Sequence, residues 1–286
     1  MSCGCRFINS GWQCPSCHKS PLSLEGFPVF APELAHTSDG FEGTHFDELA
    51  PLEAKNFWFR SRNRLIVWSL KRYFRCIDNF LEIGCGTGYV LSALEYAFPG
   101  LSISGSEIFV NGLSYAKDRV SRCDLFQVDA RNIPFENEFD VIGAFDVLEH
   151  ITEDEQVLSE MYRVVRPGGG IILTVPQHDF LWSQRDEYAC HVRRYSARGL
   201  EKKVQQAGFS VVRVTSFVSL LLPLLMLSRL RRRVPDEVYD PLLEFKIGKL
   251  TNWALEKTLG LERALIRMGL SFPAGGSLLL IARKGA

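Results

Sequence analysis

A hydrophobic run that leads directly into three closely spaced glycines constrains the fold of this chain more than any other feature. The run Leu81–Ile83 is followed by Gly84, Gly86 and Gly88. Glycine has no Cβ, so a backbone rich in it can turn tightly and approach a bound ligand closely. A dinucleotide-binding loop has the pattern G-x-G-x-x-G, but Tyr89 stands where its third glycine would be. The pattern therefore predicts a strand that ends at a ligand, and it argues against a dinucleotide.

Short β-rich runs alternate with helical stretches from Asn79 to Phe217, which predicts a parallel sheet with helices on both faces. The expected strands, including a last one near the C-terminus, are 80–84, 101–106, 125–128, 139–145, 170–175, 210–216 and 277–282. The expected helix boundaries are a capping box at Thr152 and Glu155, a cap at Ser196 with an end at Gly208, and stops at Pro99-Gly100 and Pro167-Gly168. We therefore expect an α/β fold with a Rossmann-like, seven-stranded, mostly parallel sheet.

The composition is that of a soluble globular protein. Of 286 residues, 46% are hydrophobic and 23% are charged, which excludes a disordered, collagen-like or disulfide-framework chain. The 33 basic residues balance 33 acidic ones, so no bulk charge attracts nucleic acid or an anionic membrane. The N-terminus lacks a basic region followed by an apolar stretch, and we therefore expect a reducing, cytoplasmic location.

The first 45 residues contain a cluster of cysteines, and we expect residues 1–45 to form a segment separate from an α/β domain at 46–286. Cys3 and Cys5 give C-x-C, whereas Cys14 and Cys17 give C-P-x-C-H. The second half is a good zinc-knuckle half-site, but sites with four thiolates usually use two C-x2-C pairs. Zinc binding is therefore the less favoured interpretation, and the segment is better described as a degenerate zinc ribbon.

A long helical insertion, 217–275, precedes the last strand. Its apolar run Phe217–Leu227 is broken by Pro223 and is shorter than the ~20 residues that a membrane-spanning helix needs. Four arginines follow, at positions 229 and 231–233. An apolar run beside arginines is typical of an element that lies on an anionic membrane surface, so peripheral membrane contact through 217–233 is one interpretation. The alternative is that this run packs on the sheet or forms a dimer interface.

The insertion also contains a predicted helix with Asp240 as its cap and Pro241 as its first residue. A helix with one apolar side usually covers a core. The residues that fall on one side at steps near 3.6 are Leu243, Ile247, Leu250, Ala254, Leu261, Leu265 and Met268.

Acidic residues close the strands expected after the glycines. Glu107 ends the second strand, Asp129 follows the third, Asp146 ends the fourth, and Arg166–Gly169 precedes the fifth. Together with the glycine pattern, this order resembles class I S-adenosylmethionine-dependent methyltransferases that have a type 11 methyltransferase domain. The resemblance runs from the first expected strand to the sixth and returns at the last. It implies S-adenosylmethionine as the cofactor.

The resemblance also implies a role for each residue around this cofactor. Glu82 would orient the ammonium group, and Glu107 would accept hydrogen bonds from the ribose diol, which suits a carboxylate. Asp129 would meet the adenine, while Phe145 and Asp146 would form the wall beside the sulfonium. The full set of expected cofactor-binding residues, in which the glycine loop faces the methionine part, is Glu82, Gly84, Cys85, Gly86, Gly88, Glu107, Ile108, Asp129, Ala130, Phe145 and Asp146.

His150 is the first candidate for a catalytic base, because it follows the fourth strand and imidazole titrates near neutrality. His191 is the second candidate. One alternative is that His150 caps the following helix. Another comes from quinone-pathway O-methyltransferases and small-RNA 2′-O-methyltransferases, in which a similar acid-x-x-Glu-His run binds a divalent cation. Asp146, Glu149 and His150 with a later His would supply such ligands, but those families usually have Glu in place of this Asp, so we expect no metal.

The segment Val175–Tyr195, VPQHDFLWSQRDEYACHVRRY, is rich in histidine, aromatic and arginine residues. A loop of this kind over the ligand edge of a sheet favours a substrate-facing surface. The alternative for its arginines is a structural ion pair with Asp186 or Glu187. The segment resembles one in a bacterial group of these methyltransferases that also carries an FWFRxR segment, here Phe57–Arg62, from which an arginine would meet the cofactor carboxylate. The expected acceptor contacts are His178, Trp182, Arg193, Arg194 and Tyr195.

The sequence as a whole predicts a methyltransferase that acts on oxygen or nitrogen of a small-molecule or lipid-linked metabolite. Methylation of RNA is an alternative that the cysteine cluster favours and the zero net charge opposes. A non-catalytic protein that binds S-adenosylmethionine, or a scaffold, is the alternative from another class. The pattern specifies neither the acceptor nor the oligomeric state.

Overall fold

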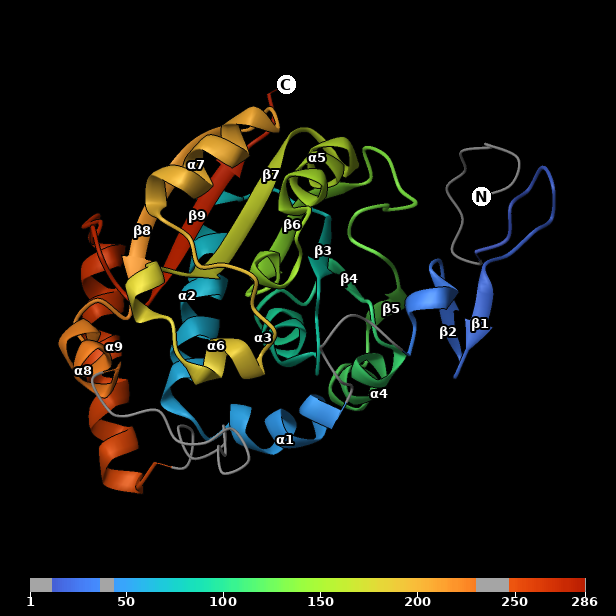
Figure 1. Ribbon diagram of the computed structural model, residues 1–286. Coiled ribbons are helices and arrows are strands. Elements are labelled where there is room, and N and C mark those ends of the chain that lie inside the picture. The colour runs from blue at the N-terminus through green and yellow to red at the C-terminus, as the bar shows by residue number, and fades with distance from the viewer. Residues whose placement is uncertain (1–11, 37–43, 230–246, 286) are drawn as a thin grey trace.

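The computed structural model describes residues 12–36, 44–229 and 247–285 (Figure 1). At its centre these residues form one sheet in the order β1-β2-β5-β4-β3-β6-β7-β9-β8. The strands are Leu22–Leu24 (β1), Phe27–Val29 (β2), Asn79–Ile83 (β3), Ser102–Glu107 (β4), Cys123–Gln127 (β5), Phe139–Phe145 (β6), Val165–Pro176 (β7), Ser210–Phe217 (β8) and Ser277–Arg283 (β9). The strands from β2 to β7 pair in parallel, and β9 is antiparallel to both of its neighbours. The predicted mostly parallel α/β fold is confirmed.

The described residues form nine strands rather than the predicted seven, because the N-terminal segment adds two to the sheet. β2 pairs with the edge strand β5 through Val29 and Gln127. The Gln127 side chain also accepts a hydrogen bond from the Ala31 nitrogen at 3.0 Å and donates to the Ala31 oxygen at 2.8 Å. Phe27 and Val29 are buried in the main core. In the described part of the chain, the N-terminal segment therefore packs on the edge of the same sheet.

Helices cover both faces of the sheet. In Figure 1, α5 and α7 lie in front of the sheet and α2 lies behind it, while α1 and α6 lie beyond the carboxyl ends of the parallel strands. The helices are Thr44–Glu53 (α1), Phe57–Tyr73 (α2), Tyr89–Ala97 (α3), Val110–Arg119 (α4), Asp154–Val164 (α5), Gln184–Tyr188 (α6), Ala197–Gln206 (α7), Leu222–Arg229 (α8) and Lys249–Arg267 (α9), with short 3-10 turns at Pro32–Leu34 (η1), Leu148–His150 (η2) and Asp179–Leu181 (η3).

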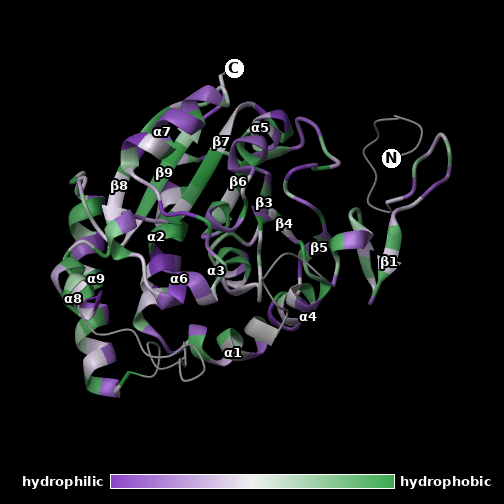
Figure 2. Ribbon diagram, in the orientation of Figure 1, coloured by the Kyte–Doolittle hydropathy of each residue, from purple (hydrophilic) through white to green (hydrophobic). Residues whose placement is uncertain are grey.

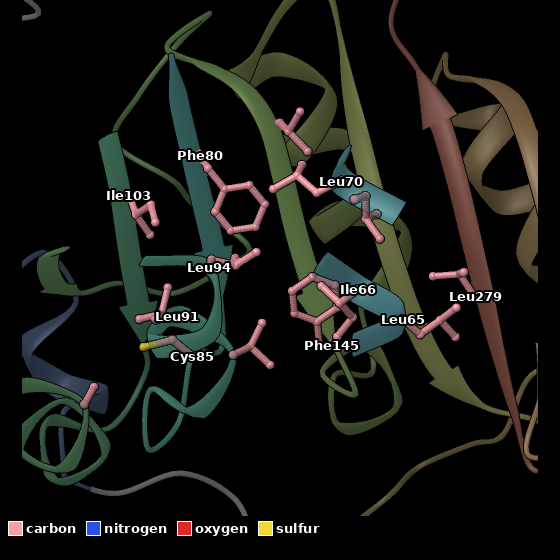
Figure 3. Close-up of a cluster of buried hydrophobic side chains, with 14 of the residues drawn as sticks. Leu65, Ile66, Leu70, Phe80, Cys85, Leu91, Leu94, Ile103, Phe145 and Leu279 are labelled. Carbon is pink, nitrogen blue, oxygen red and sulfur yellow. The ribbon is translucent and has the colours of Figure 1, made fainter. Parts of the chain in front are cut away.

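The central strands send alternate side chains into two separate cores. Phe80 of β3 is fully buried on the α2 side, where Ile66 and Leu70 lie (Figure 3), and the next residue, Leu81, is fully buried on the α5 side. A sheet covered on both faces has strands that are hydrophobic along most of their length, as Figure 2 shows for β7 and β9. Each such buried side chain contributes about 1.5–3 kcal/mol of transfer free energy, which fixes the sheet that carries the site.

One of the predicted helix boundaries is wrong. Helix α5 begins at Asp154 without a side-chain cap, so Thr152 and Glu155 do not form a capping box. The predicted stop is confirmed, because α5 ends at Val164, before Pro167-Gly168, and this dipeptide lies in β7, which follows directly. Ser196 is confirmed as a cap, because its hydroxyl accepts a hydrogen bond at 3.0 Å from a backbone N–H of α7.

Helix α9 buries the side opposite to the predicted one. Its predicted start at Asp240 and Pro241 lies outside the described residues, as do Leu243 and the arginines at 231–233. Leu250, Leu261 and Met268, on the predicted interior side, are 79%, 59% and 76% exposed.

The buried side of α9 carries Leu259, Glu262 and Ile266. The Glu262 carboxylate accepts hydrogen bonds from the backbone nitrogens of Val218 and Leu220 at 2.6 and 2.8 Å, after the end of β8. Because an acidic residue lies on the buried side, hydrophobic periodicity alone does not identify that side as buried. Helix α8 is short, and no helix in the described part of the chain is both long and apolar enough to cross a membrane.

Candidate functional site

A cavity of about 790 Å³ opens where β3, β4, β5 and β6 end. β3 lies between β4 and β6 in the sheet, so the strand order reverses at this point, where ligands of such folds usually bind. Helices α1 and α2 and the segment 185–192 supply the other walls. Ligand pockets typically enclose about 300–1,000 Å³, so the cavity has room for a nucleoside and a second small molecule.

Ten of the eleven residues predicted to bind the cofactor line this cavity: Glu82, Gly84, Cys85, Gly86, Glu107, Ile108, Asp129, Ala130, Phe145 and Asp146. Gly84 and Gly86 have φ angles of +66° and +50°, in the left-handed region that favours glycine. Gly88 is not among the described lining residues. A Cβ at Gly88 would lie 2.8 Å from the Cα of Ala116, so this glycine lets α3 pack against α4 rather than facing the cavity as predicted.

Two buried carboxylates stand at the ends of β3 and β4. Glu107 accepts hydrogen bonds from the backbone nitrogens of Gly86 and Ile108, both at 2.9 Å. Burial raises the pKa of Glu107, although these bonds favour its charged form. Burial also raises the pKa of Glu82 well above its usual range, with the Arg62 charge opposing and the Glu107 charge adding to the shift. A ligand that brings positive charge and hydroxyl groups would therefore fit between them.

Helix α2 closes over the cavity through an ion pair. Arg62 pairs with Asp146 at the end of β6, and its guanidinium lies 4.7 Å from the Trp58 ring. Asp146 has a φ angle of +59°, a conformation that is uncommon for residues other than glycine and that concentrates at functional sites. Phe145, the residue before it, also lines the cavity. The aromatic and basic segment before β3 thus contributes directly to the site.

Asp129 and Ala130 form the wall that follows β5. One Asp129 carboxylate oxygen accepts hydrogen bonds from the backbone nitrogen and the Nε of Arg131, at 2.9 and 3.0 Å. The local turn therefore fixes the orientation of this acid at the rim of the cavity.

A second group of polar residues, at the end of α1, is not among the predicted site residues. Glu53 accepts hydrogen bonds from the Thr87 hydroxyl at 2.7 and 2.9 Å and pairs with Arg119. Glu53 and Thr87 both line the cavity. Thr87 lies within the glycine loop and could have been selected on that ground, whereas no motif marks Glu53.

His150 and His191 meet at the cavity wall. Their rings lie 4.7 Å apart and nearly perpendicular. The Nδ1 of His191 lies 2.9 Å from a carboxylate oxygen of Asp186, and Arg194 donates to both oxygens of that acid at 2.8 and 3.0 Å. Burial alone would raise the pKa of Asp186, but the bonds from His191 and Arg194 outweigh it and hold this pKa well below the usual range. Asp186 is therefore a charged group that orients His191. His150 lies in η2, three residues before Glu153, the N-cap residue of α5.

The other predicted acceptor contacts lie outside the described residues that line the cavity. Arg193 and the Tyr195 hydroxyl both reach Asp154, each at 2.7 Å, while Arg194 holds Asp186 as the ion-pair alternative had it. The five residues concerned are His178, Trp182, Arg193, Arg194 and Tyr195. In this arrangement the arginines and the tyrosine support the segment that carries His191.

The segment 177–195 forms a loop whose two ends meet. Gln177 bridges Tyr195 in parallel, the Tyr195 nitrogen donates to the Pro176 oxygen at 2.9 Å, and the His178 nitrogen donates to the Tyr195 oxygen at 3.1 Å. The loop is therefore anchored at the end of β7, and its middle part reaches the cavity.

The predicted cysteine site is only partly visible. Cys14 is buried and Cys17 is half-buried, and Cys3 and Cys5 lie outside the described residues. A site formed by these four thiols remains a prediction.

A mostly parallel sheet of this order, with a cavity at its switch point and acids at successive strand ends, defines a Rossmann-like, nucleoside-binding class of protein. Comparison with known families identifies the family within this class. Residues 46–214, more than half of the chain, match the family described as "Methyltransferase domain", and the chain belongs to that family. It carries an S-adenosylmethionine-dependent methyltransferase domain.

Curated relatives agree with this assignment. The chain is 29% identical over 164 residues to a protein of Mycolicibacterium smegmatis named "Probable S-adenosylmethionine-dependent methyltransferase", covering 56% of this chain and 62% of that one. It is 31% identical over 151 residues to the 27-O-demethylrifamycin SV methyltransferase of Amycolatopsis mediterranei, covering 50% of each. The matches thus span between half and two thirds of these relatives.

Solved structures show the same fold. Phosphoethanolamine N-methyltransferase 2 of Haemonchus contortus, in complex with S-adenosyl-L-methionine, has a TM-score of 0.57 at 19% identity and covers 85% of this chain and 57% of its own. The [4+2]-cyclase SpnF also has a TM-score of 0.57, at 18% identity, covering 85% and 96%. Because one of these names a methyltransferase and the other a cyclase, the fold by itself does not fix the reaction.

Proposed function

We propose that this protein transfers the methyl group of S-adenosylmethionine to an oxygen or nitrogen atom of a small-molecule acceptor. The observation that carries the proposal is that one cavity is lined both by the carboxylates Glu82 and Glu107 and by the imidazoles of His150 and His191. A cofactor held by the first pair and an acceptor held by the second would share one site. Such confinement replaces a bimolecular encounter by a reaction between positioned groups.

The cofactor end of this site accounts for each polar part of S-adenosylmethionine. Glu107, already fixed by two backbone nitrogens, accepts hydrogen bonds from the ribose hydroxyls. The cofactor ammonium stabilises the charged form of Glu82, which burial alone disfavours. Asp129 meets the adenine amino group, and Arg62 faces the cofactor carboxylate.

The acceptor end supplies a base for the proton that the acceptor oxygen or nitrogen loses. The acceptor atom attacks the methyl carbon, the carbon–sulfur bond breaks, and its electron pair stays on sulfur. Because the Nδ1 of His191 faces Asp186 at 2.9 Å, its Nε2 is the nitrogen that takes the acceptor proton. His150 orients the same acceptor from the neighbouring wall.

A lipid-linked acceptor is the form of this proposal that the insertion supports. Leu224, Met226 and Leu227 of α8 are 56%, 48% and 63% exposed, and Trp253 of α9 is 57% exposed. These side chains would enter the interface of a membrane, in accord with peripheral contact through 217–233 on the cytoplasmic side. Binding to anionic vesicles should fall in a variant that combines Leu224→Ser and Leu227→Ser. It should persist in Tyr96→Ser, which changes a 92% exposed aromatic on α3.

The test of the proposed function is product identification. The protein is incubated with a cell extract and S-adenosylmethionine that carries a labelled methyl group, and the labelled product is identified by mass spectrometry. His191→Ala serves as the matched control, because it alters the acceptor end alone. Saturable cofactor binding without labelled product in any fraction would instead favour a non-catalytic binding protein.

A further inference from the structure

Glu149, in η2, carries a buried carboxylate close to the cavity wall. The residue has no exposed surface, and neither carboxylate oxygen has a hydrogen-bond donor among the described residues. Leaving an ionised carboxylate in such a place is strongly unfavourable unless a counter-charge compensates it. The two arginines whose charges act on Glu149 are Arg62 and Arg194, and both are already engaged with other acids.

Two imidazoles lie beside this carboxylate. One ligand atom each from Glu149, His150 and His191 lies within 4.8 Å of the other two. A triangle with sides of 4.8 Å places its centre about 2.8 Å from each corner, so each ligand atom closes by at most roughly 0.8 Å to reach the 2.0–2.2 Å of metal–nitrogen and metal–oxygen bonds. One carboxylate oxygen and two imidazole nitrogens are a donor set that first-row divalent cations bind.

Contacts outside this triangle hold it in place. The Val192 nitrogen donates to the Glu149 backbone oxygen at 2.8 Å, which ties the two segments that carry the histidines. The Nδ1 of His191 faces Asp186 at 2.9 Å, and Arg194 fixes that acid in turn. A histidine that binds a metal usually donates its other ring N–H to a carboxylate in this way, which sets the tautomer and the ring orientation.

We infer that Glu149, His150 and His191 bind a divalent first-row transition-metal cation at the acceptor end of the cavity. Three protein ligands leave coordination positions open. Because His150 and His191 line the cavity whereas Glu149 is buried behind it, the open positions face the acceptor. One carboxylate and two neutral imidazoles leave a bound divalent cation with a net charge of +1, which attracts an anionic oxygen.

This inference rests on the proposed function and narrows it to oxygen as the methylated atom. An acceptor hydroxyl bound to the cation loses its proton to water more readily than a free one. The oxygen lone pair then forms the bond to the methyl carbon, and the electron pair of the breaking carbon–sulfur bond stays on sulfur. The cation thereby takes over the activation that His191 would otherwise perform as a base.

Titration with Mn²⁺ tests the site directly. Manganese suits carboxylate and imidazole ligands better than thiolates, so the cysteines compete little. The full chain is treated with a chelator, dialysed and titrated, and free Mn²⁺ is followed by its electron paramagnetic resonance signal. We expect one site per chain, with binding weakened in Glu149→Gln and in His191→Ala by more than the roughly 10- to 100-fold that loss of an outer-shell partner costs. His178→Ala removes an imidazole from the same loop but outside the cluster, and should bind as the unaltered protein does.

The outcomes separate this inference from the proposed function. If Glu149→Gln fails to fold, as judged by circular dichroism, His150→Ala and His191→Ala decide the question, because both side chains lie at the cavity wall. No saturable Mn²⁺ binding, or equal binding in these variants, overturns the cation site. Labelled product formed in the presence of chelator would then leave the methyltransferase proposal standing. Mn²⁺ bound at this site without any binding of S-adenosylmethionine would support the cation site and overturn the methyltransferase proposal.

Discussion

The two ends of the cavity are built in different ways. The centre of the cofactor end is a short segment, since the loop that contains Gly84 and Gly86 follows Glu82 directly, and the parallel strands β4 and β6 bring Glu107 and Asp146 beside it. The acceptor end brings together His150 and His191, which are 41 positions apart and lie outside the strands. The first end therefore depends on one short loop and on the register of the sheet. The second depends on how two distant segments meet, and each end should respond to its own set of substitutions.

The largest expected effect is at the glycine loop. Gly86→Val should abolish binding of S-adenosylmethionine, because a β-branched side chain is strained at a φ of +50° and would occupy the cavity. Isothermal titration measures the affinity, and thermal unfolding checks that the chain still folds. Gly100→Ala is the control, since a Cβ there meets nothing within 4 Å. Micromolar affinity in Gly86→Val would mean that the cofactor lies elsewhere.

The second prediction addresses the acceptor end. His191→Ala should lower the rate of methyl transfer by about 100-fold or more, the usual contribution of acceptor activation, and leave cofactor affinity unchanged. Rate and affinity are measured on the same preparation once an acceptor is known. His18→Ala, in the N-terminal turn, should change neither quantity. A rate equal to that of the unaltered protein would exclude His191 from the chemistry.

A smaller effect is expected at Glu107. Glu107→Gln should weaken cofactor binding by about 1–3 kcal/mol, because the charged hydrogen bonds to the ribose are lost while the side chain keeps its shape. Titration calorimetry gives this difference. Glu95→Gln alters a carboxylate that serves only the turn at Ser121 and Arg122, and should have no effect on binding. If both variants bind equally well, the ribose does not lie at Glu107.

The smallest effect is the coupling of cofactor binding to pH. Burial raises the pKa of Glu82 in the free protein, and a cofactor ammonium would lower it again. Binding should therefore release protons and become tighter as pH rises through this raised pKa. Calorimetry in two buffers of different ionisation enthalpy counts the protons, and Glu82→Gln should abolish the release.

The same shift affects stability with the opposite sign. An unfolded chain loses the Glu82 proton near the ordinary value of 4.5, whereas the folded chain keeps it to higher pH. The contribution of this residue to folding is therefore complete below the ordinary value and is lost as pH rises toward the raised one. A denaturation series from pH 4 upward on the free protein, compared with Glu82→Gln, measures the difference.

The cofactor end could be predicted from the sequence because its signals are local. The buried strand runs directly into the glycines at 84 and 86, and Glu107 stands at the end of the very next strand, 21 positions after Gly86. Even at the cofactor end, the role of Gly88 could not be predicted from the sequence. A glycine in a ligand loop and a glycine that permits close helix packing look the same in a sequence. They are told apart only by the structure, in which a Cβ added at Gly88 would lie 2.8 Å from the Ala116 Cα.

The acceptor end could be predicted only in part, because its contacts join distant residues. The sequence indicated His150 and His191 but not that they touch, and it gave no sign that the Glu149 carboxylate lacks a partner. The pairing of Arg62 with Asp146 spans 84 positions. The buried side of α9 was predicted incorrectly for a related reason. Its Glu262 is buried because it accepts hydrogen bonds from backbone nitrogens after β8, and the helix sequence alone does not show this contact.

The loop 177–195 has a practical consequence, because both of its ends are fixed to each other through Gln177 and Tyr195. Arg185, Ala189 and Cys190 line the cavity from this loop and can be exchanged while His191 and its support by Asp186 and Arg194 are kept. A library of such exchanges should yield proteins that share one methyl donor and differ in the molecules they modify.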